Sequence, residues 1–333
     1  MLSTLSLLSL LVACGEKDLN TDTGSTSTDT STESPDTGLE DTDTTDTQDP
    51  TDTQDTTDTQ DTSDTQDTNT GSETVEGLNM SGSYTGTATS SSISVASCDN
   101  PVNFTQVSTS APNAPTVLIA HGFFRSPDNM IEWGNHLATW GVNALVIEMC
   151  TLFDHQTNGM VLSEIPSALG ISDYLYLGFS AGGLASLVAG ANSSPLGIVT
   201  LDPVEDMNGT GSTIGQINVP VVGVIGEPSD CNSQNNGITL LQSVGASTIL
   251  RVTDADHCDF EGPTDETCED GLFGIGACAN TLANISDDSI RGTIRTLGTA
   301  GILWLGGLDS SAEDYWTGSA MQSLQSQGLI SPL

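Results

Sequence analysis

Residues 174–185 read YLYLGFSAGGLA, an apolar run interrupted by one serine, Ser180, among small residues. The serine is the centre of a G-x-S-x-G motif, placed where a predicted strand passes into a predicted helix. In such a turn the two backbones pass so closely that only small residues fit beside the serine. The turn also exposes the serine oxygen, and the helix N-terminus behind it favours developing negative charge. This context predicts that Ser180 is a nucleophile.

Short apolar runs on both sides of this motif predict strands of a parallel sheet that is covered on both faces. Two earlier segments alternate polar and apolar residues, as exposed antiparallel strands do. Interleaved helices favour an α/β fold with a mostly parallel central sheet and helices on both faces. No regular element is predicted beyond Gly306. The expected strands are residues 84–95, 102–110, 116–120, 143–149, 174–179, 197–201, 219–226 and 247–253, and the expected helices are 128–140, 181–191 and 286–305.

A nucleophilic serine needs a base and an oxyanion site. His257 follows the last apolar run, where the chain should return to the edge of the sheet that carries Ser180, and it is the predicted base. His121 ends an earlier strand in the sequence His-Gly-Phe-Phe, which matches a loop that supplies an oxyanion donor, so its side chain is predicted to be structural. The backbone amides of Phe123 and Ala181 are the predicted pair of donors.

The two other histidines receive no catalytic role. His136 lies inside the first predicted helix, as a packed or surface residue, and His155 lies in a predicted loop.

Two aspartates satisfy the chain order serine, acid, histidine. Asp202 ends the strand GIVTL, and Asp230 follows the next strand in VPVVGVIGEPSD. Either one is positioned to orient the ring of His257. These candidates fall in five short motifs: HGF (121–123), GFSAGG (178–183), LDPVE (201–205), GEPSDCN (226–232) and DHCDFE (256–261).

As an ordered set, these motifs resemble the α/β-hydrolase superfamily over residues 102–308. The branch they resemble most holds chlorophyllases, platelet-activating-factor acetylhydrolases and dienelactone-hydrolase-like esterases. In chlorophyllases and the acetylhydrolases the acid ends the strand after the nucleophile helix, which implies Asp202. In polyester hydrolases and dienelactone hydrolases it lies one strand later, which matches Asp230. The resemblance favours Asp202, with Asp230 as the alternative acid.

The expected site is open. The segment 203–218, between two predicted strands, is short and rich in Gly, Asn and Thr. It leaves little room for the helical lid that lipases insert. Such a site suits soluble or polymer-end esters better than an oil interface. Arg125, just beyond the oxyanion loop, has two interpretations: it holds an acidic group of a substrate, or it pairs with a local carboxylate.

The charge of the chain is strongly acidic throughout. The net charge is −39, of which residues 16–76 supply −18 (19 acids and one Lys) and the rest −21 (25 acids and four Arg). A chain without a basic face is not expected to bind nucleic acid.

The N-terminal part predicts export. Residues 1–13 read as a signal peptide, and Leu11-Val12-Ala13-Cys14 resembles the bacterial lipobox, so Cys14 is the predicted lipidation site. Residues 14–80 are expected to form a disordered linker rich in Thr and Asp. Its expected role is that of a flexible spacer. O-glycosylation of its Thr and Ser residues and loose binding of cations by its carboxylates are the alternatives. The catalytic domain is expected over residues 81–333.

Six cysteines follow Cys14, and an exported protein is expected to form up to three disulfides from them. Six cysteines can pair in 15 ways. The preferred pairs are Cys231–Cys258 and Cys268–Cys278, with Cys98–Cys150 left over. No CxxC pair is present, so neither a zinc site nor any other metal or cofactor is expected.

These features predict a serine esterase that works through an acyl-enzyme, in which His257 takes the proton from Ser180. The expected partners are a small-molecule or polymer ester and, through the lipid anchor, a membrane of the bacterial cell envelope; the protein is expected to be a monomer. A binding lipoprotein without chemistry and a peptidase or thioesterase are the alternatives.

Overall fold

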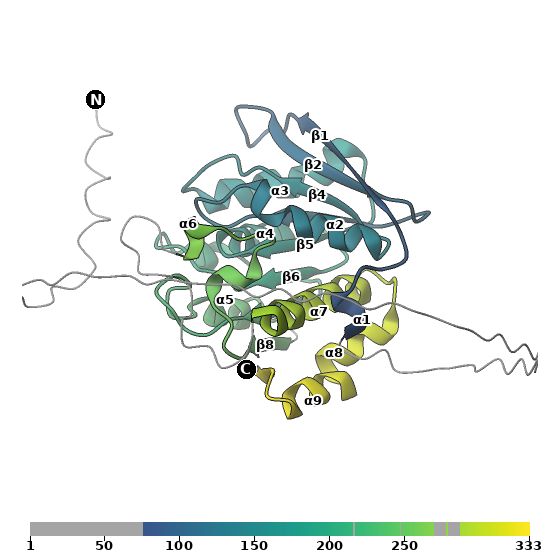
Figure 1. The fold of residues 1–333 in the computed structure, drawn as a ribbon. Coiled ribbons are helices and arrows are strands. Elements are labelled where there is room, and N and C mark those ends of the chain that lie inside the picture. Colours follow the sequence, from purple (N-terminus) through teal and green to yellow (C-terminus); the bar gives the residue numbers. More distant parts are fainter. Residues whose placement is uncertain (1–75, 216, 247, 270–277, 279–286) are drawn as a thin grey trace, which may run out of the picture. The chain divides into compact units, whose positions relative to one another are not determined.

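The computed structural model describes residues 76–215, 217–246, 248–269, 278 and 287–333. A nine-stranded sheet runs through this part in the order β1-β2-β4-β3-β5-β6-β7-β8-β9, parallel from β4 to β8 (Figure 1). Antiparallel pairing is confined to its two edges, where β1 pairs with β2, β2 with β4, and β8 with β9. The strands are β1 (Gly86–Ile93), β2 (Val102–Thr109), β3 (Thr116–Ala120), β4 (Asn143–Ile147), β5 (Tyr174–Phe179), β6 (Ile198–Leu201), β7 (Val221–Ile225), β8 (Thr248–Val252) and β9 (Ile330–Pro332).

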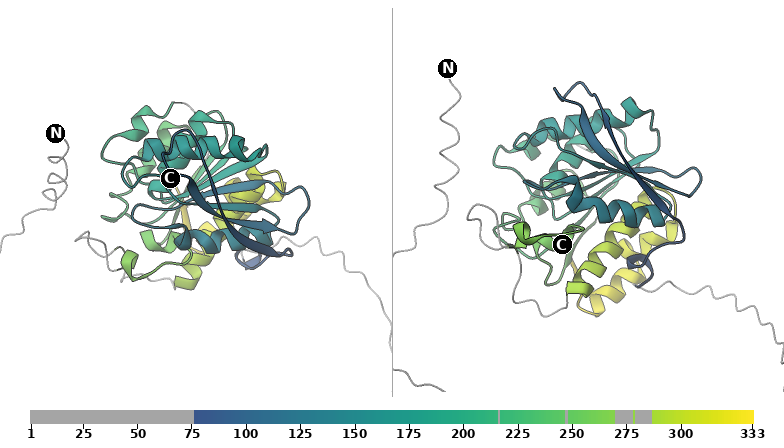
Figure 2. Two further views of the ribbon diagram at one scale, coloured as in Figure 1. Left: turned by 90° about the horizontal axis from the view of Figure 1, so that it is seen from above. Right: turned by 45° about the horizontal axis from the view of Figure 1, so that its top comes forward.

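Helices cover both faces of the sheet (Figure 2). On one face α2, α7, α8 and α9 pack on the sheet, and on the other face α3, α4 and α5 do so. The predicted α/β fold is therefore confirmed. The helices are α1 (Glu76–Asn79), η1 (Pro127–Met130), α2 (Ile131–Thr139), α3 (His155–Leu169), α4 (Ala181–Asn192), η2 (Thr210–Thr213), α5 (Gly237–Ser243), η3 (His257–Phe260), α6 (Glu266–Glu269), α7 (Asp287–Leu305), η4 (Ser310–Glu313), α8 (Asp314–Thr317) and α9 (Ser319–Ser326), where η marks a 3-10 helix.

The continuous apolar runs of the central strands reflect two separate cores. In β5, Leu175 and Leu177 face the core under α2 and α7, whereas Tyr174 and Tyr176 face the core under α3 and α4. Side chains alternate across a strand, so a strand buried on both faces needs apolar residues at every position.

The folded part begins before its predicted start at Ser81. Leu78, in α1, is buried in the core beside α7, and its carbonyl oxygen accepts a hydrogen bond from Nε2 of His136 (3.0 Å). His136 is thus a packed residue, and burial lowers its pKa to about 4. At least the segment from Glu76 belongs to the domain.

His155 is predicted to lie in a loop, but it begins the helix α3, which continues to Leu169. Asp154 caps its first turn, because a side-chain oxygen accepts a hydrogen bond from the amide of Thr157. Pro166 has no N–H for the carbonyl of Leu162, and the hydroxyl of Tyr176 donates to that oxygen instead (3.3 Å). A tertiary contact therefore compensates the proline that weakens the helical pattern.

Three disulfides join cysteines in the described part of the chain, and two of the predicted pairings are wrong. Cys98–Cys150 is present, but the other bridges are Cys231–Cys278 and Cys258–Cys268. The segment after β8 turns back on itself, which brings the Cα atoms of Cys258 and Cys268 to 5.8 Å. The sulfur atoms of Cys258, Cys268 and Cys278 all lie within 4.8 Å of one another, so the two bridges are neighbours. Spacing along the sequence could not separate these pairings.

The segment between β6 and β7 is described except for residue 216. Its described residues contain the 3-10 helix η2, which has four residues, and no helix longer than that. Among the described residues, none of the helices has the length and apolar character needed to cross a membrane.

Candidate active site

Ser180 occupies a sharp turn between β5 and α4. Its backbone has φ 55° and ψ −122°, a conformation that residues other than glycine rarely adopt. A Cβ at Gly178 would lie 2.2 Å from the carbonyl oxygen of Gly182, and a Cβ at Gly182 would lie 2.3 Å from that of Ala120. Glycine at these two positions is therefore required by the close approach of strand and helix.

Ser180, His257 and Asp202 form a continuous hydrogen-bonded chain. Nε2 of His257 lies 3.0 Å from Oγ of Ser180, and Nδ1 lies 2.6 Å from Oδ2 of Asp202. All three residues are buried, and they come from the ends of three different strands. His257 opens η3 just after β8, and the ring of Phe179 packs on the imidazole at a centroid distance of 4.7 Å.

The structure brings Asp202, and not Asp230, to the histidine. The two oxygens of Asp202 also accept hydrogen bonds from the amide of Gly226 and from Nδ2 of Asn232, both at 3.1 Å. Asp230 is exposed and accepts a hydrogen bond from Gln234. Asn232, which orients Asp202, was not predicted, although it lies within the quoted motif GEPSDCN.

The loop after β3 is held by His121. Nδ1 of its ring donates to the carbonyl oxygen of Gly122 (2.8 Å), while Nε2 accepts from the amide of Met149 (3.2 Å). Burial lowers the pKa of His121 to about 4, so the ring is neutral, as this arrangement requires. Phe123 and Ala181, the predicted oxyanion donors, line one cavity together with His121. The structural role expected for His121 is the one observed.

Two cavities lie side by side at this edge of the sheet and share the residues 123–125. The first is lined by Ser180, His257 and both disulfides that follow β7. The second is lined by Ala181, His121 and the segment 148–152, and it has a volume of about 200 Å³, against about 100 Å³ for the first.

Arg125 is already paired. Its Nε and one terminal nitrogen bind the two carboxylate oxygens of Glu261 at 2.5 and 2.7 Å, and Asp265 lies 2.9 Å away. The side chain of Glu261 is fully buried. Burial opposes the charge of Arg125, but the bonds to Glu261 and Asp265 outweigh it and raise the pKa of the guanidinium. Of the two interpretations of Arg125, the structure shows the local ion pair.

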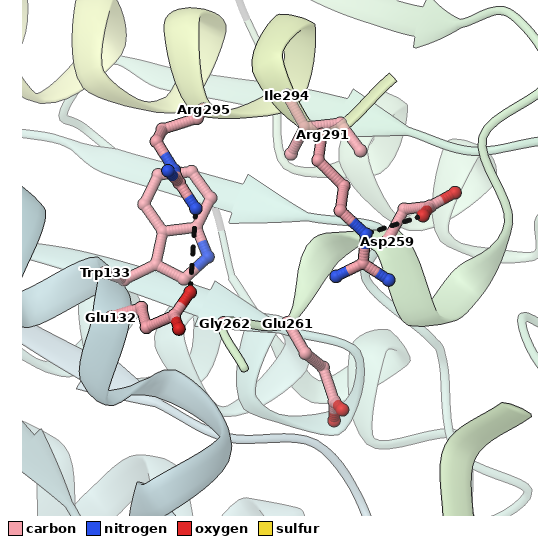
Figure 3. A pocket seen from close by; sticks show the side chains of 8 residues that line it. All are labelled: Glu132, Trp133, Asp259, Glu261, Gly262, Arg291, Ile294 and Arg295. Atoms are coloured by element: carbon pink, nitrogen blue, oxygen red, sulfur yellow. Dashed lines mark ion pairs between the residues drawn. The ribbon is translucent and has the colours of Figure 1, made fainter. Parts of the chain in front are cut away.

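The other three arginines of the folded part also form ion pairs with carboxylates. Arg291 and Arg295 reach from α7 to Asp259 (3.2 Å) and Glu132 (3.6 Å), as Figure 3 shows, and Arg251 lies 3.8 Å from Glu227. Burial, with the nearby charge of Asp256, raises the pKa of Asp259 to about 7.

Further hydrogen bonds join the same regions. The amide of Gly262 donates to the carbonyl oxygen of Asn129 (2.7 Å), and Nε1 of Trp133 donates to that of Phe260 (3.0 Å). The segment that carries His257 is thus fixed to η1 and to α2.

The predicted lipidation site, Cys14, lies outside the described residues, as do the signal peptide and nearly all of the expected linker.

Comparisons with known proteins add little to this geometry. No family model and no curated protein matches the chain. Among solved structures, a dienelactone hydrolase from Anabaena variabilis ATCC 29413 matches with 20% identity over 52% of this chain and 89% of its own, at a TM-score of 0.43. A mostly parallel sheet, a serine on the turn from strand to helix, and an acid and a histidine that follow in that order are features of the α/β-hydrolase fold, which is the fold of this chain.

Proposed function

We propose that this protein is a serine hydrolase that cleaves carboxylic esters through an acyl-enzyme. The observation that carries the proposal is the hydrogen-bonded chain from Asp202 through His257 to Ser180. A serine hydroxyl is a weak nucleophile unless an adjacent base takes its proton, and an imidazole needs a fixed tautomer to do so.

The geometry supports a definite sequence of proton transfers. Asp202 accepts a hydrogen bond from the N–H at Nδ1 and stays ionised, which leaves Nε2 of His257 free to take the proton from Oγ of Ser180 as the oxygen attacks the ester carbonyl. His257 then gives this proton to the departing alcohol oxygen. Water attacks the acyl-enzyme by the same steps and releases the acid.

Negative charge on the carbonyl oxygen needs donors that are already in place. Ala181 is the first residue of α4, so its amide has no partner within the helix, and the positive end of the helix dipole points to the same place. Phe123 supplies the second amide in this proposal, from the loop that His121 holds.

A fluorophosphonate probe and a panel of p-nitrophenyl esters test the proposal directly. Wild-type protein should be labelled at Ser180 and should hydrolyse the esters, and the Ser180→Ala variant should do neither. Thioesters and peptide substrates in the same panel test the alternative activities. Absence of both labelling and ester hydrolysis in correctly folded protein would refute the proposal.

We further propose that the enzyme is exported and anchored to the bacterial cell envelope through lipid on Cys14. The apolar segment and the lipobox-like sequence before Cys14 support this proposal. Full-length protein expressed in a bacterium should incorporate labelled fatty acid and should partition with membranes. The Cys14→Ser variant should lose the label, and equal labelling of both proteins would exclude this anchor.

A further inference from the structure

The proton transfers proposed above distinguish the two cavities beside Ser180. His257 must reach the oxygen of the leaving alcohol, so the alcohol must lie on the side of the serine that His257 lines. That side is the cavity bounded by the two neighbouring disulfides. The acyl group must therefore extend to the other side, into the cavity lined by Ala181 and by the segment 148–152.

One side of this second cavity is formed by aromatic rings and a leucine. Phe123 contacts Phe124 and Phe153 at centroid distances of 4.2 and 5.4 Å, and the ring of His155 meets Phe123 edge-on at 6.1 Å. Phe153 remains 53% exposed and Leu152 44% exposed. Large apolar side chains that stay exposed together beside a cavity mark a binding surface.

The charges around this cavity disfavour an anionic ligand. Arg125 is the one cation among the described residues that line it, and the carboxylates of Glu261 and Asp265 more than neutralise it. Burial lowers the pKa of His155, so its ring carries no charge at neutral pH. The exposed carboxylate of Glu148 adds negative charge at the rim.

We propose that the cavity formed by Phe123, Phe124, Leu152 and His155, with Phe153 at its edge, is an acyl site for uncharged aromatic or branched apolar acyl groups. This proposal rests on the proposed esterase function. It assigns the substrate class on the acid side of the ester, with carboxylate-bearing acyl groups excluded.

Three p-nitrophenyl esters that differ only in the acyl group test the assignment: the acetate, the 4-methylbenzoate and the 4-carboxybenzoate. Each kcat/KM is divided by the rate of alkaline hydrolysis of the same ester, which removes differences in intrinsic reactivity. Wild-type enzyme should favour 4-methylbenzoate over 4-carboxybenzoate by about tenfold or more, because a hydrophobic site discriminates between such groups on this scale and the local charge adds repulsion.

Two leucines provide a matched pair of variants. Leu152→Ala should lower the ratio of 4-methylbenzoate to acetate hydrolysis by roughly fivefold, as expected when an apolar pocket loses contact area. Leu196 is 38% exposed but lies two residues before β6, at the opposite end of the parallel strands, and Leu196→Ala should leave the ratio unchanged. Glu148→Gln should reduce the discrimination against 4-carboxybenzoate, and added salt should do the same for wild type.

The outcomes separate the two proposals. Active enzyme that shows no preference between the two benzoates, or a Leu152→Ala variant that matches Leu196→Ala, would overturn the acyl site and leave the esterase intact. Failure of labelling by the fluorophosphonate together with inactivity toward all three esters would instead overturn the esterase proposal itself.

Discussion

Ser180 and Asp202 both have backbone conformations that are strained in any residue other than glycine. Their φ angles are 55° and 42°. Non-glycine residues with positive φ are uncommon and persist where the surrounding structure determines them. Here the amide of Ser180 donates to the carbonyl of Leu201 and the amide of Asp202 donates to that of Val224. The strand ends thus hold the two residues in the positions from which they meet His257.

The choice of acid leads to the first prediction. Asp202→Asn should lower kcat by a factor on the order of 10⁴ with little change in substrate binding, because the amide fixes the wrong tautomer of His257. Asp230→Asn, exposed in the loop after β7, should cost less than about tenfold because its field is screened. Steady-state kinetics of both variants provide the measurement. The reverse ranking would move the acid one strand along the chain.

The second prediction concerns Asp259 and pH. Its pKa is raised to about 7 in the folded protein, from 3.8, so between these values the folded state binds more protons than the unfolded state. This contribution to stability is complete below pH 3.8 and is lost as pH rises through 7. Asp259→Asn removes the titration and keeps an acceptor for the amide of Asp256.

Relative to wild type, the Asp259→Asn variant should therefore become more stable as the pH is raised from 4 to 8. The free energy of unfolding in urea, measured for both proteins across this range, tests the direction. A difference that does not change with pH would show that Asp259 has an ordinary pKa.

At the scale of elements, the segment from η3 to α6 is fixed by ion pairs. Glu261→Gln breaks the bidentate contact with Arg125, two residues beyond Phe123, and should lower kcat by about tenfold while KM for a small ester changes little. The reason is geometric: small displacements of a donor cost transition-state stabilisation. Removing one partner of a buried pair should also cost about 3–5 kcal/mol of stability.

Glu132→Gln serves as the control for this third prediction. Its ion pair with Arg295 is longer and its side chain is 52% exposed, so it should change kcat less than twofold. Titration of active sites with the fluorophosphonate probe corrects for unfolded protein. Equal losses of kcat in both variants would contradict a positioning role for Glu261.

The disulfides supply the fourth prediction. A dithiol reductant should lower the melting temperature, because loss of a native disulfide typically costs ~2–5 kcal/mol. Peptide mapping after chymotryptic cleavage at Phe260 should recover Cys258 linked to Cys268. Free thiols at all six positions in exported protein would refute the bridges, and a Cys231–Cys258 link would refute their pattern.

The limits of sequence reasoning follow from the same elements. Continuous apolar runs identified all six parallel strands of the sheet, and the small residues around Ser180 identified the turn, since both depend on local packing. The helix α3 was missed because its proline is compensated by the hydroxyl of Tyr176, which lies in the next strand and not in the helix. Asn232 and the pairing of Cys231 with Cys278 depend on how loops from different strands meet, which no local pattern records.

For the whole molecule, the fifth prediction separates the acidic N-terminal part from the domain. A chain that starts at residue 68 should keep the activity and melting temperature of the full protein. A chain that starts at Ser81 lacks α1 and should lose roughly 2–3 kcal/mol, as expected when a buried leucine such as Leu78 is removed. Identical melting temperatures for the two truncations would contradict the role of α1.

The four paired arginines have a practical consequence for proteolysis. Trypsin cuts after Lys and Arg, and apart from Lys17 the chain offers it only these four sites. Arg251 lies in β8, Arg291 and Arg295 lie in α7, and Arg125 is clamped by Glu261. A protease cleaves such bonds only in molecules that have opened. The rate of tryptic digestion of the domain therefore measures its opening equilibrium without interference from surface nicking, whereas chymotrypsin finds the exposed Phe153 in the closed state.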